Sequence, residues 1–531
     1  MNDGSNKNYV IGRDNIQPFG LDIHNPVFLI SGLSVTAFVL VTLLFQTEAA
    51  AFFGWLRPQI TSNFDWFFLL SGNVFVIFSL FLVVSPLGKI RLGGANARPE
   101  FGYIGWFSML FAAGMGIGLM FFGVSEPISH FNSSLGGIAV DAAGVRTDWA
   151  PLGAALGDTE GARDLAMAAT IFHWGLHPWS IYAIVGLALA FFAYNYKLPL
   201  TLRSAFYPLL GDRVWGFWGH VIDILAVFAT LFGLTTSLGL GTKQALSGFN
   251  YLFGWGTDSL AVVLLISVIT AIATVSVVRG LNGGVKILSE LNMGLAMLLL
   301  IFIIVMGPTA DIFDAIFGGA AAYVKEIIPL STPFGREDAN FSQGWTSFYW
   351  AWWISWSPFV GMFIARVSKG RTVREFVLCV VIVPTLLGIV WMGAFGGTAI
   401  SQVIADAGAP VATAAQELKL FVMVESFPMA SLLSLVGVIL VLVFFITSSD
   451  SGSLVVDSLT AGGKENAPIV QKVFWCSFEG VLAIVLLIVG GSEALGALQA
   501  MSVSTGLPFT IVLLAMCVSL YMGLRKEYSK M

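Results

Sequence analysis

Charged residues, cysteine and histidine are all scarce in this chain. Only 11% of its 531 residues are charged, and it has three cysteines and five histidines. Cys379, Cys476 and Cys517 lie singly in apolar segments, so their spacing predicts neither a disulfide framework nor a metal site. The formal net charge of −5 forms no large patch, and we expect no nucleic-acid partner. With so few histidines and no convergent carboxylates, the sequence gives little support to a membrane enzyme acting on a quaternary ammonium compound.

Apolar residues take the place of the missing polar ones. They make up 57% of the chain, and the mean hydropathy is +0.85. This composition is typical of a polytopic membrane protein. The first 25 residues are polar and the first apolar run is long enough to span, so we expect no cleaved signal peptide. We predict an all-α protein with twelve transmembrane helices, at 26–46, 65–87, 103–125, 165–194, 216–250, 259–278, 283–307, 346–366, 373–398, 428–458, 469–490 and 495–523.

The distribution of lysine and arginine predicts the orientation. If both ends and every second loop face the cytoplasm, most of the 26 basic residues lie on that side. We therefore predict a multi-pass protein of the plasma (inner) membrane with both termini cytoplasmic. The basic linker 368–374 lies near the lipid surface, where some sensitivity to membrane lipid is expected.

The third predicted helix is unusually rich in glycine, with Gly114, Gly116 and Gly118 in mid-membrane. Each glycine weakens a helix by about 1 kcal/mol relative to alanine. Irregular backbone at that depth belongs where it lines a cavity. Close helix packing through small residues is the alternative, and it accounts for Gly114 and Gly118 but not for Gly116. We therefore predict an unwound segment here.

The predicted helices divide into two sets of five. Helices 3–7 and 8–12 each open with an interrupted helix, and the second interruption is expected around Trp356–Phe359. This arrangement indicates an inverted-repeat transporter with its site near the membrane midplane. The predicted regions are a cytoplasmic segment 1–25, two peripheral helices in 26–102, a first repeat 103–307, an extracytoplasmic loop 308–345 with an amphipathic helix, a second repeat 346–523 and a short cytoplasmic tail 524–531.

Tryptophan is concentrated in the eighth predicted helix, at positions 350, 352, 353 and 356. The indole face is the best aromatic partner for a cation, and aromatic cages bind quaternary ammonium groups. Tryptophan also populates the interfacial belts of membrane proteins, but a belt does not require four of them on two adjacent turns. The cluster therefore favours a cation site.

The fourth predicted helix supplies further aromatic residues. Pro178 should kink or open it. Around that proline stand Trp174, Trp179 and Tyr182, which with Trp353 could close a four-walled box. His173 and His177 are spaced as a metal pair, but no third ligand is evident, so packing or hydrogen bonding is the favoured interpretation.

The tenth predicted helix carries the hydroxyl-rich motif Thr447-Ser-Ser-Asp450. Hydroxyl and carbonyl oxygens suit a hard monovalent cation, and together with the broken third helix they predict a sodium site. The competing interpretation is that these hydroxyls bond to their own helix. For Asp450, we expect a structural or gating hydrogen bond.

Three motifs, Gly114-Met-Gly-Ile-Gly118, the tryptophan-rich run 350–356 and Thr447-Ser-Ser-Asp450, resemble the betaine/carnitine/choline transporter family. The resemblance extends over essentially the whole chain. It implies a homotrimer of the sodium-symporter-like (LeuT-type) fold with a 5+5 inverted repeat in helices 3–12. It also implies sodium-coupled import of a methylated zwitterion, glycine betaine or dimethylsulfoniopropionate, without a cofactor other than the coupling ion.

The resemblance also implies which residues bind what. Substrate would be bound by Trp174, Trp179, Tyr182, Trp353, Met115 and Trp356. Sodium would be bound by Ala112, Met115, Phe444, Thr447 and Ser448, and a second sodium by Thr230 and Phe359. Within the second site Leu234 departs from the family pattern, which pairs two threonines, and Thr235 or Thr236 could substitute.

Other members of the same family define the alternatives. Gly118 and Met115 favour sodium-coupled uptake over a proton-coupled choline importer or a sodium-independent carnitine/betaine exchanger. The tail after the last helix lacks a long basic extension, so we do not expect strong osmotic activation by a C-terminal helix. Either nutrition or osmoprotection would be compatible with such an importer.

Overall fold

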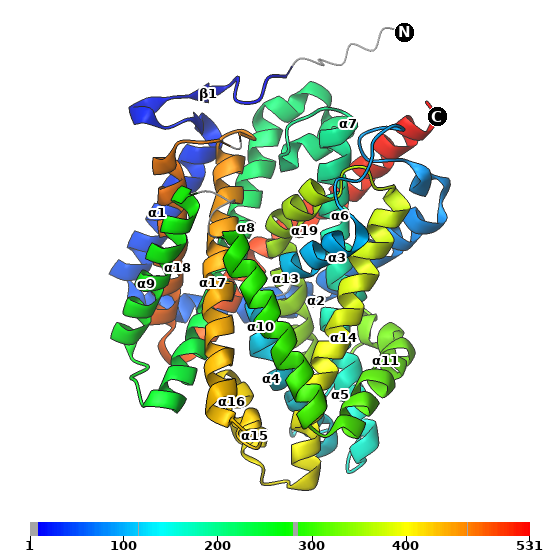
Figure 1. The fold of residues 1–531 in the computed structure, drawn as a ribbon, viewed down its shortest axis with the longest axis vertical. Helices are drawn as coiled ribbons and strands as arrows, with labels where there is room; N and C mark the ends of the chain where they lie inside the picture. Colours follow the sequence, from blue (N-terminus) through cyan, green and yellow to red (C-terminus); the bar gives the residue numbers. More distant parts are fainter. Residues whose placement is uncertain (1–8, 115, 280–284, 465) are drawn as a thin grey trace.

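The computed structural model describes residues 9–114, 116–279, 285–464 and 466–531. Within these residues the only sheet is a two-stranded pair, β1 (Asn15–Ile16) and β2 (Ile23–His24). All the other long elements are helices (Figure 1). They are α1 (Asn25–Leu44), α2 (Gln46–Val84), α3 (Tyr103–Gly114), α4 (Ile117–Gly136), α5 (Thr159–Trp174), α6 (Leu176–Tyr194), α7 (Tyr207–Leu210), α8 (Phe217–Phe253), α9 (Ser259–Arg279), α10 (Val285–Met306), α11 (Thr309–Ser331), α12 (Ala339–Phe341), α13 (Ser347–Val367), α14 (Val373–Ala405), α15 (Pro410–Thr413), α16 (Lys419–Val424), α17 (Ala430–Thr460), α18 (Ile469–Gly490) and α19 (Ala494–Tyr528).

The helices confirm a polytopic membrane protein. Nine stretches of the described residues are long and apolar enough to cross a membrane. A helix or a pair of helices overlaps most of each predicted range, while the count of twelve spans and the inverted repeat stay predictions. β1 and the end of α19 lie at the same end of the molecule (Figure 1).

The predicted interruption of the third helix is confirmed. α3 ends at Gly114 and α4 begins at Ile117. Between them Gly116 has φ −154° and ψ −139°, far from helical values. Met115 lies outside the described residues.

The predicted interruption around Trp356–Phe359 is wrong. α13 runs without a break from Ser347 to Val367, with Pro358 inside it. A proline in mid-helix leaves the carbonyl four residues earlier without its usual donor. Here that carbonyl belongs to Ile354, and the hydroxyl of Ser357 donates to it at 2.7 Å. This side-chain bond replaces the lost backbone bond, as happens in membrane helices.

The fourth predicted helix opens near Pro178, as expected. α5 ends at Trp174 and α6 begins at Leu176, and Gly175 between them has φ −102° and ψ −127°. Two box candidates are therefore on different helices, with Trp174 at the end of α5 and Trp179 in the first turns of α6.

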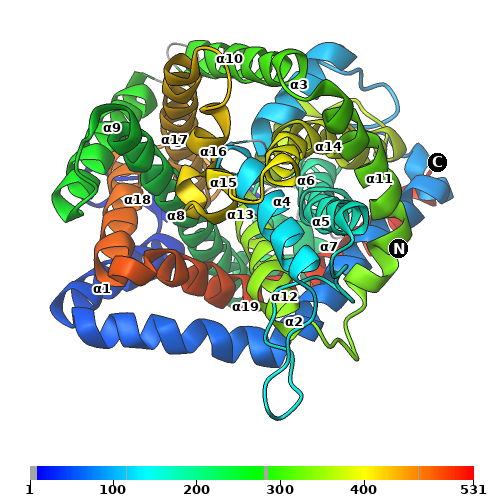
Figure 2. The ribbon, with the colours of Figure 1, turned by 90° about the horizontal axis from the view of Figure 1, so that it is seen from below.

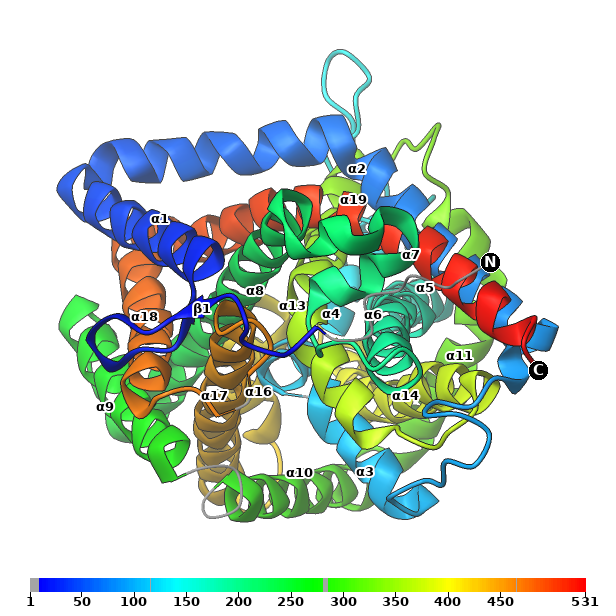
Figure 3. The ribbon, with the colours of Figure 1, turned by 90° about the horizontal axis from the view of Figure 1, so that it is seen from above.

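The tryptophan-rich helix α13 lies in the middle of the molecule. It packs against α2, α6, α8 and α19, and the view from above shows it surrounded by helices (Figure 3). The view from below shows α2 running along one outer edge (Figure 2). α13 is consequently buried along most of its length, from Ser347 to Gly361.

Candidate substrate and ion sites

The four predicted box residues lie together in the core. The ring of Trp353 contacts that of Trp174, with centroids 4.9 Å apart, and that of Tyr182, at 6.1 Å. Tyr182 in turn contacts Trp179 at 5.5 Å. All three pairs are edge-to-face, with interplanar angles of 76–82°. Each of the four side chains is at most 4% exposed. We call Trp174, Trp179, Tyr182 and Trp353 the aromatic box.

The polar edges of two box residues are fixed by hydrogen bonds. The indole N–H of Trp174 donates to Glu126 Oε2 at 2.7 Å. The indole N–H of Trp353 donates to the backbone carbonyl of His173 at 2.9 Å. Because an indole with a bonded N–H and a packed face cannot rotate freely, these two walls are held in place.

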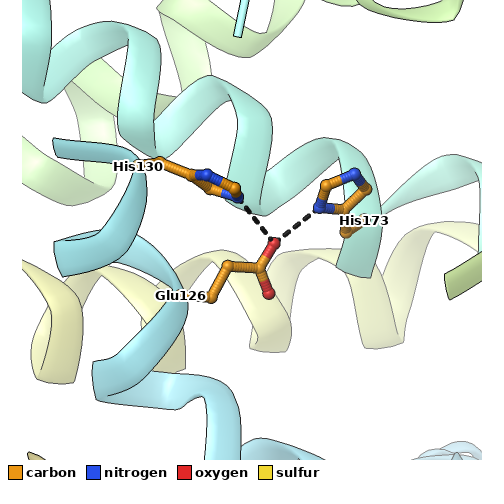
Figure 4. A group of neighbouring side chains, drawn as sticks. All are labelled: Glu126, His130 and His173. Atoms are coloured by element: carbon orange, nitrogen blue, oxygen red, sulfur yellow. Dashed lines mark hydrogen bonds and ion pairs between the residues drawn. The ribbon is translucent and has the colours of Figure 1, made fainter. Parts of the chain in front are cut away.

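Glu126 is the centre of a buried network that was not predicted from the sequence. Its Oε1 lies 2.6 Å from Nδ1 of His173 and 3.3 Å from Nε2 of His130 (Figure 4). Its Oε2 also accepts the hydroxyl of Tyr349 at 2.5 Å. A carboxylate inside an apolar segment is itself a functional signal. The predicted third helix stopped at residue 125, one residue before Glu126, so that signal was missed.

A metal ion could in principle bind to this cluster, since ligand atoms of Glu126, His130 and His173 all lie within 4.8 Å of one another. These atoms already bond to one another, and Nε2 of His173 lies 2.9 Å from the hydroxyl of Thr346. The hydrogen bonds satisfy the donors and acceptors without an ion. His177, the other half of the sequence pair, instead contacts Asn73 Oδ1 at 3.1 Å and stacks on Trp350. Both histidines therefore make hydrogen bonds, as expected.

Of the two remaining substrate candidates, the structure describes Trp356. Trp356 packs edge-to-face against Phe359, with centroids 5.4 Å apart. Its indole nitrogen and the hydroxyl of Tyr182 are buried without a hydrogen-bond partner among the described residues. Met115 lies outside the described residues. Two unpaired donors thus accompany the aromatic faces.

Gly118 permits the close approach of the box to α4. A Cβ atom at this position would lie 2.7 Å from the Trp174 ring and 3.0 Å from the Trp352 ring. Real Cβ atoms do not approach other heavy atoms so closely, and aromatic rings in a packed core cannot yield easily. The last glycine of the motif is therefore needed for space at the box.

The predicted sodium ligands on α17 share one face. Phe444, Thr447 and Ser448 are all half-buried, and their three- and four-residue spacing places them side by side. A Cβ on Gly116, at the break before α4, would lie 3.8 Å from the Phe444 ring. The structure therefore brings the broken helix next to this face. Ala112 lies in the last turn of α3, whose side chains are not described.

The hydroxyl of Thr447 bonds to its own helix. It donates to the carbonyl of Val443 at 2.9 Å and lies 3.3 Å from that of Phe444. Asp450, two residues beyond Ser448, is buried, and neither of its carboxylate oxygens has a hydrogen-bond partner among the described residues. The hydroxyl of Ser276 on α9 lies near this carboxylate, so the structural or gating hydrogen bond expected for Asp450 stays a prediction.

The two candidates for a second sodium site, Thr230 and Phe359, lie on α8 and α13, which pack against each other. Thr230 donates to the carbonyl of Ala226 at 2.8 Å, whereas Phe359 packs on Trp356. Leu234 fills the space beside Gly452, where a Cβ would lie 2.3 Å from it. Thr235 donates to its own helix at 2.6 Å.

The second possible substitute, Thr236, points elsewhere. Its hydroxyl contacts the carbonyl of Leu498 at 3.0 Å and the hydroxyl of Ser502 at 2.8 Å, both on α19. The Thr236 hydroxyl is therefore hydrogen-bonded on the side of α8 that faces α19.

Taken together, membrane-length helices and a buried cluster of four aromatic rings define a polytopic membrane protein with an aromatic core. The comparison with known families makes this more specific. The family described as BCCT, betaine/carnitine/choline family transporter, matches residues 26–529. The chain belongs to this family.

Relatives with names support the same conclusion. The chain is 60% identical over 523 residues to a glycine betaine/proline/choline transporter of Vibrio parahaemolyticus, covering 98% of this chain and 94% of the relative. It is 55% identical to glycine betaine transporter 1 of the same species, covering 98% and 97%. A glycine betaine transporter of Acinetobacter baylyi is 40% identical, with 96% and 74% covered. The protein is accordingly a membrane transporter and not an enzyme.

Proposed function

We propose that this protein is a sodium-coupled secondary transporter that imports a methylated zwitterion, with glycine betaine as its first substrate. The observation that carries the proposal is the aromatic box, with four rings at most 4% exposed and joined edge to face. A quaternary ammonium group cannot donate a hydrogen bond, so aromatic faces are its natural partners. The names of the relatives support glycine betaine as the substrate.

The carboxylate of the substrate would need donors. The hydroxyl of Tyr182 and the indole N–H of Trp356 are buried donors without a partner among the described residues, and an unsatisfied buried donor costs about 1–3 kcal/mol. A bound carboxylate would satisfy them. Dimethylsulfoniopropionate carries a methylated sulfonium cation and a carboxylate, so we propose it as a second substrate.

The face formed by Phe444, Thr447 and Ser448 supports sodium coupling. The Phe444 ring of this face lies beside the break between α3 and α4, and the Thr447 hydroxyl lies 3.3 Å from the Phe444 carbonyl. Irregular backbone of this kind supplies coupling-ion ligands in transporters with broken helices. Sodium bound there would order the broken helix, the box would hold the methylated head, and one group of helices would rock against the rest to alternate access.

The second candidate is sodium-independent exchange or choline import by the same box. Choline has the cationic head but a neutral hydroxyl in place of the carboxylate, so it would bind the donors of Tyr182 and Trp356 less strongly. One named relative transports choline as well as glycine betaine, so we expect choline to compete weakly.

The test is uptake of radiolabelled glycine betaine into proteoliposomes, with and without an inward sodium gradient. We expect accumulation only with the gradient. Unlabelled dimethylsulfoniopropionate should compete strongly, with carnitine third and choline fourth. Accumulation that requires a preloaded internal substrate and ignores sodium would instead identify an exchanger.

We also propose a homotrimer in the plasma (inner) membrane with both termini cytoplasmic. That β1 and the end of α19 share one end of the molecule supports a common side for the two ends (Figure 1). Mass measurement in detergent and labelling of single cysteines placed in the tail test these two points.

A further inference from the structure

Glu126 is an acidic residue in direct contact with the aromatic box, through the indole N–H of Trp174. Its side chain is fully buried, and four donors face its two oxygens. Oε1 meets nitrogens of His130 and His173, and Oε2 meets the indole N–H of Trp174 and the hydroxyl of Tyr349. A protonated carboxyl group would need to donate at one of these four positions. An ionised carboxylate accepts from all four groups at once, and the Trp174 N–H can act only as a donor, so this form fits the site best.

Among the described residues, the basic side chains in contact with this carboxylate are the histidines His130 and His173, and no lysine or arginine contacts it. His173 donates from Nδ1 to Glu126, and its Nε2 can accept the hydroxyl of Thr346, so a neutral ring satisfies both bonds. Arg336 makes a two-pronged pair with Asp338, at 3.0 and 2.7 Å. A negative charge therefore stands beside the box.

Glu126 holds two walls of the box from one point. It accepts the N–H of Trp174 directly. It reaches Trp353 through His173, whose ring is bonded to Glu126 and whose carbonyl accepts the Trp353 N–H. Hydrogen bonds from a ring N–H to an anion also polarise the donor. Electron density moves toward the indole face, where a cation binds.

We propose that Glu126 is a positioning residue that fixes Trp174 and Trp353 and gives the box its preference for cations over neutral groups of the same shape. The inference rests on the proposed function, because it concerns the substrate of the same box. A carboxylate that only held the rings in place would favour cationic and neutral ligands equally. A carboxylate that also acts by its charge favours the cation.

The experiment compares two ligands of the same shape. Glycine betaine has a trimethylammonium head, and 3,3-dimethylbutanoate has a neutral tert-butyl head on the same carboxylate. Both are measured by displacement of radiolabelled glycine betaine from purified protein in saturating sodium. We expect the wild type to prefer glycine betaine strongly. In Glu126→Gln, which keeps an acceptor oxygen but loses the charge, that preference should fall about tenfold.

A second variant separates charge from position. Glu126→Asp keeps the charge but is one methylene shorter, so it cannot reach all four donors. It should weaken both ligands and change their affinity ratio by less than about twofold. Glu493→Gln, an exposed glutamate between α18 and α19, is the control for loss of a carboxylate elsewhere. Elution as a single oligomer in detergent shows that each variant has folded.

The outcomes distinguish this inference from the proposed function. If Glu126→Gln leaves the ratio of the affinities for glycine betaine and 3,3-dimethylbutanoate unchanged, the inference is overturned. This holds whether or not both affinities fall, and Glu126 would then have a purely structural role. If Glu126→Gln does not fold, Glu126→Asp provides the test. Because this variant keeps the charge, a large fall in its preference for glycine betaine over 3,3-dimethylbutanoate would also overturn the inference. A wild type that binds neither ligand would contradict the proposed function itself, before any variant is made.

Discussion

The aromatic box and the ion face of α17, formed by Phe444, Thr447 and Ser448, are built in opposite ways. Each fixed polar edge of the box is bonded to another helix, as Trp174 of α5 is to Glu126 of α4 and Trp353 of α13 is to His173 of α5. The hydroxyl of Thr447 bonds within its own helix. Hydrogen bonds between helices hold the box in place, whereas the hydroxyl of the ion face is held by a bond within one helix.

This difference determines how substitutions should act. A change in the box disturbs groups on several helices, and effects of residues within one network do not add. A change on the ion face removes an oxygen and leaves the surrounding helices as they are. Substrate affinity should therefore depend on the box, and sodium dependence on α17, with little crossover at saturating concentrations.

The largest effect is expected for Trp353→Leu, because Trp353 contacts both Trp174 and Tyr182. If a cation–π contact contributes about 1–2 kcal/mol, the half-saturation constant for substrate should rise tenfold or more. Uptake kinetics at saturating sodium measure it. Trp55→Leu is the matched control, since Trp55 is 55% exposed on α2. Unchanged affinity in a normally expressed Trp353→Leu variant would remove this residue from the box.

Gly118→Ala should have the next largest effect. The new methyl group would meet Trp174 at 2.7 Å and push that ring out of place. Overpacking of this kind costs about 1–3 kcal/mol, so we expect substrate affinity to fall at least fivefold. Gly105→Ala on α3 is the control, because a Cβ there would have no neighbour within 4 Å. Equal behaviour of the two variants would mean that the position of Trp174 does not matter for binding.

The double variant Thr447→Ala, Ser448→Ala tests the other side of the comparison. We expect the sodium concentration for half-maximal uptake to rise several-fold, while substrate affinity at saturating sodium stays within twofold. Thr242→Ala on α8 is a suitable control, since Thr242 is a buried threonine that, like Thr447, donates to its own helix. A loss of substrate affinity equal to that of Trp353→Leu would show that the two regions are not separate.

The sequence predicted features whose cause is local. Three glycines within five residues weaken a helix wherever it lies, and the break between α3 and α4 was found where they stand. Trp174, Trp179 and Tyr182 were expected to be neighbours from their spacing around Pro178, and the structure confirms this. Trp353, on another helix, also lies beside them, as expected. Their assignment to the substrate stays a prediction.

Features that depend on a compensating partner could not be predicted. Pro358 indicates a break only if nothing replaces its missing N–H, and Ser357 does replace it by bonding to Ile354. Glu126 acquires its role from Trp174 and Tyr349, which are distant in sequence. Sequence spacing shows which residues share a helix face, but not which residue on another helix satisfies them.

A second carboxylate with a full set of donors, Asp148, lies in the loop between α4 and α5. It accepts the backbone N–H groups of Ala139 and Ala150, both at 3.0 Å, and pairs with Arg146 at 2.6 Å. The Arg146 guanidinium lowers the pKa of Asp148 to about 2. This pKa is below the value of about 3.9 for an unfolded chain. The stabilisation is therefore complete above about pH 4 and is lost as the pH falls through about 2.

Asp148→Asn should therefore have the smallest effect on transport. We expect unchanged substrate affinity, because Asp148 bonds only within the outer loops. The amides of Ala139 and Ala150 should exchange hydrogen for deuterium about fivefold faster, as about 1 kcal/mol of protection is lost. After correction for intrinsic rates, this difference should be constant from pH 5 to 8, where Asp148 is fully ionised. Glu160→Gln, at the exposed start of α5, is the control. Reduced substrate affinity in Asp148→Asn would show that the loop and the box are coupled, and that a tertiary network extends beyond Glu126.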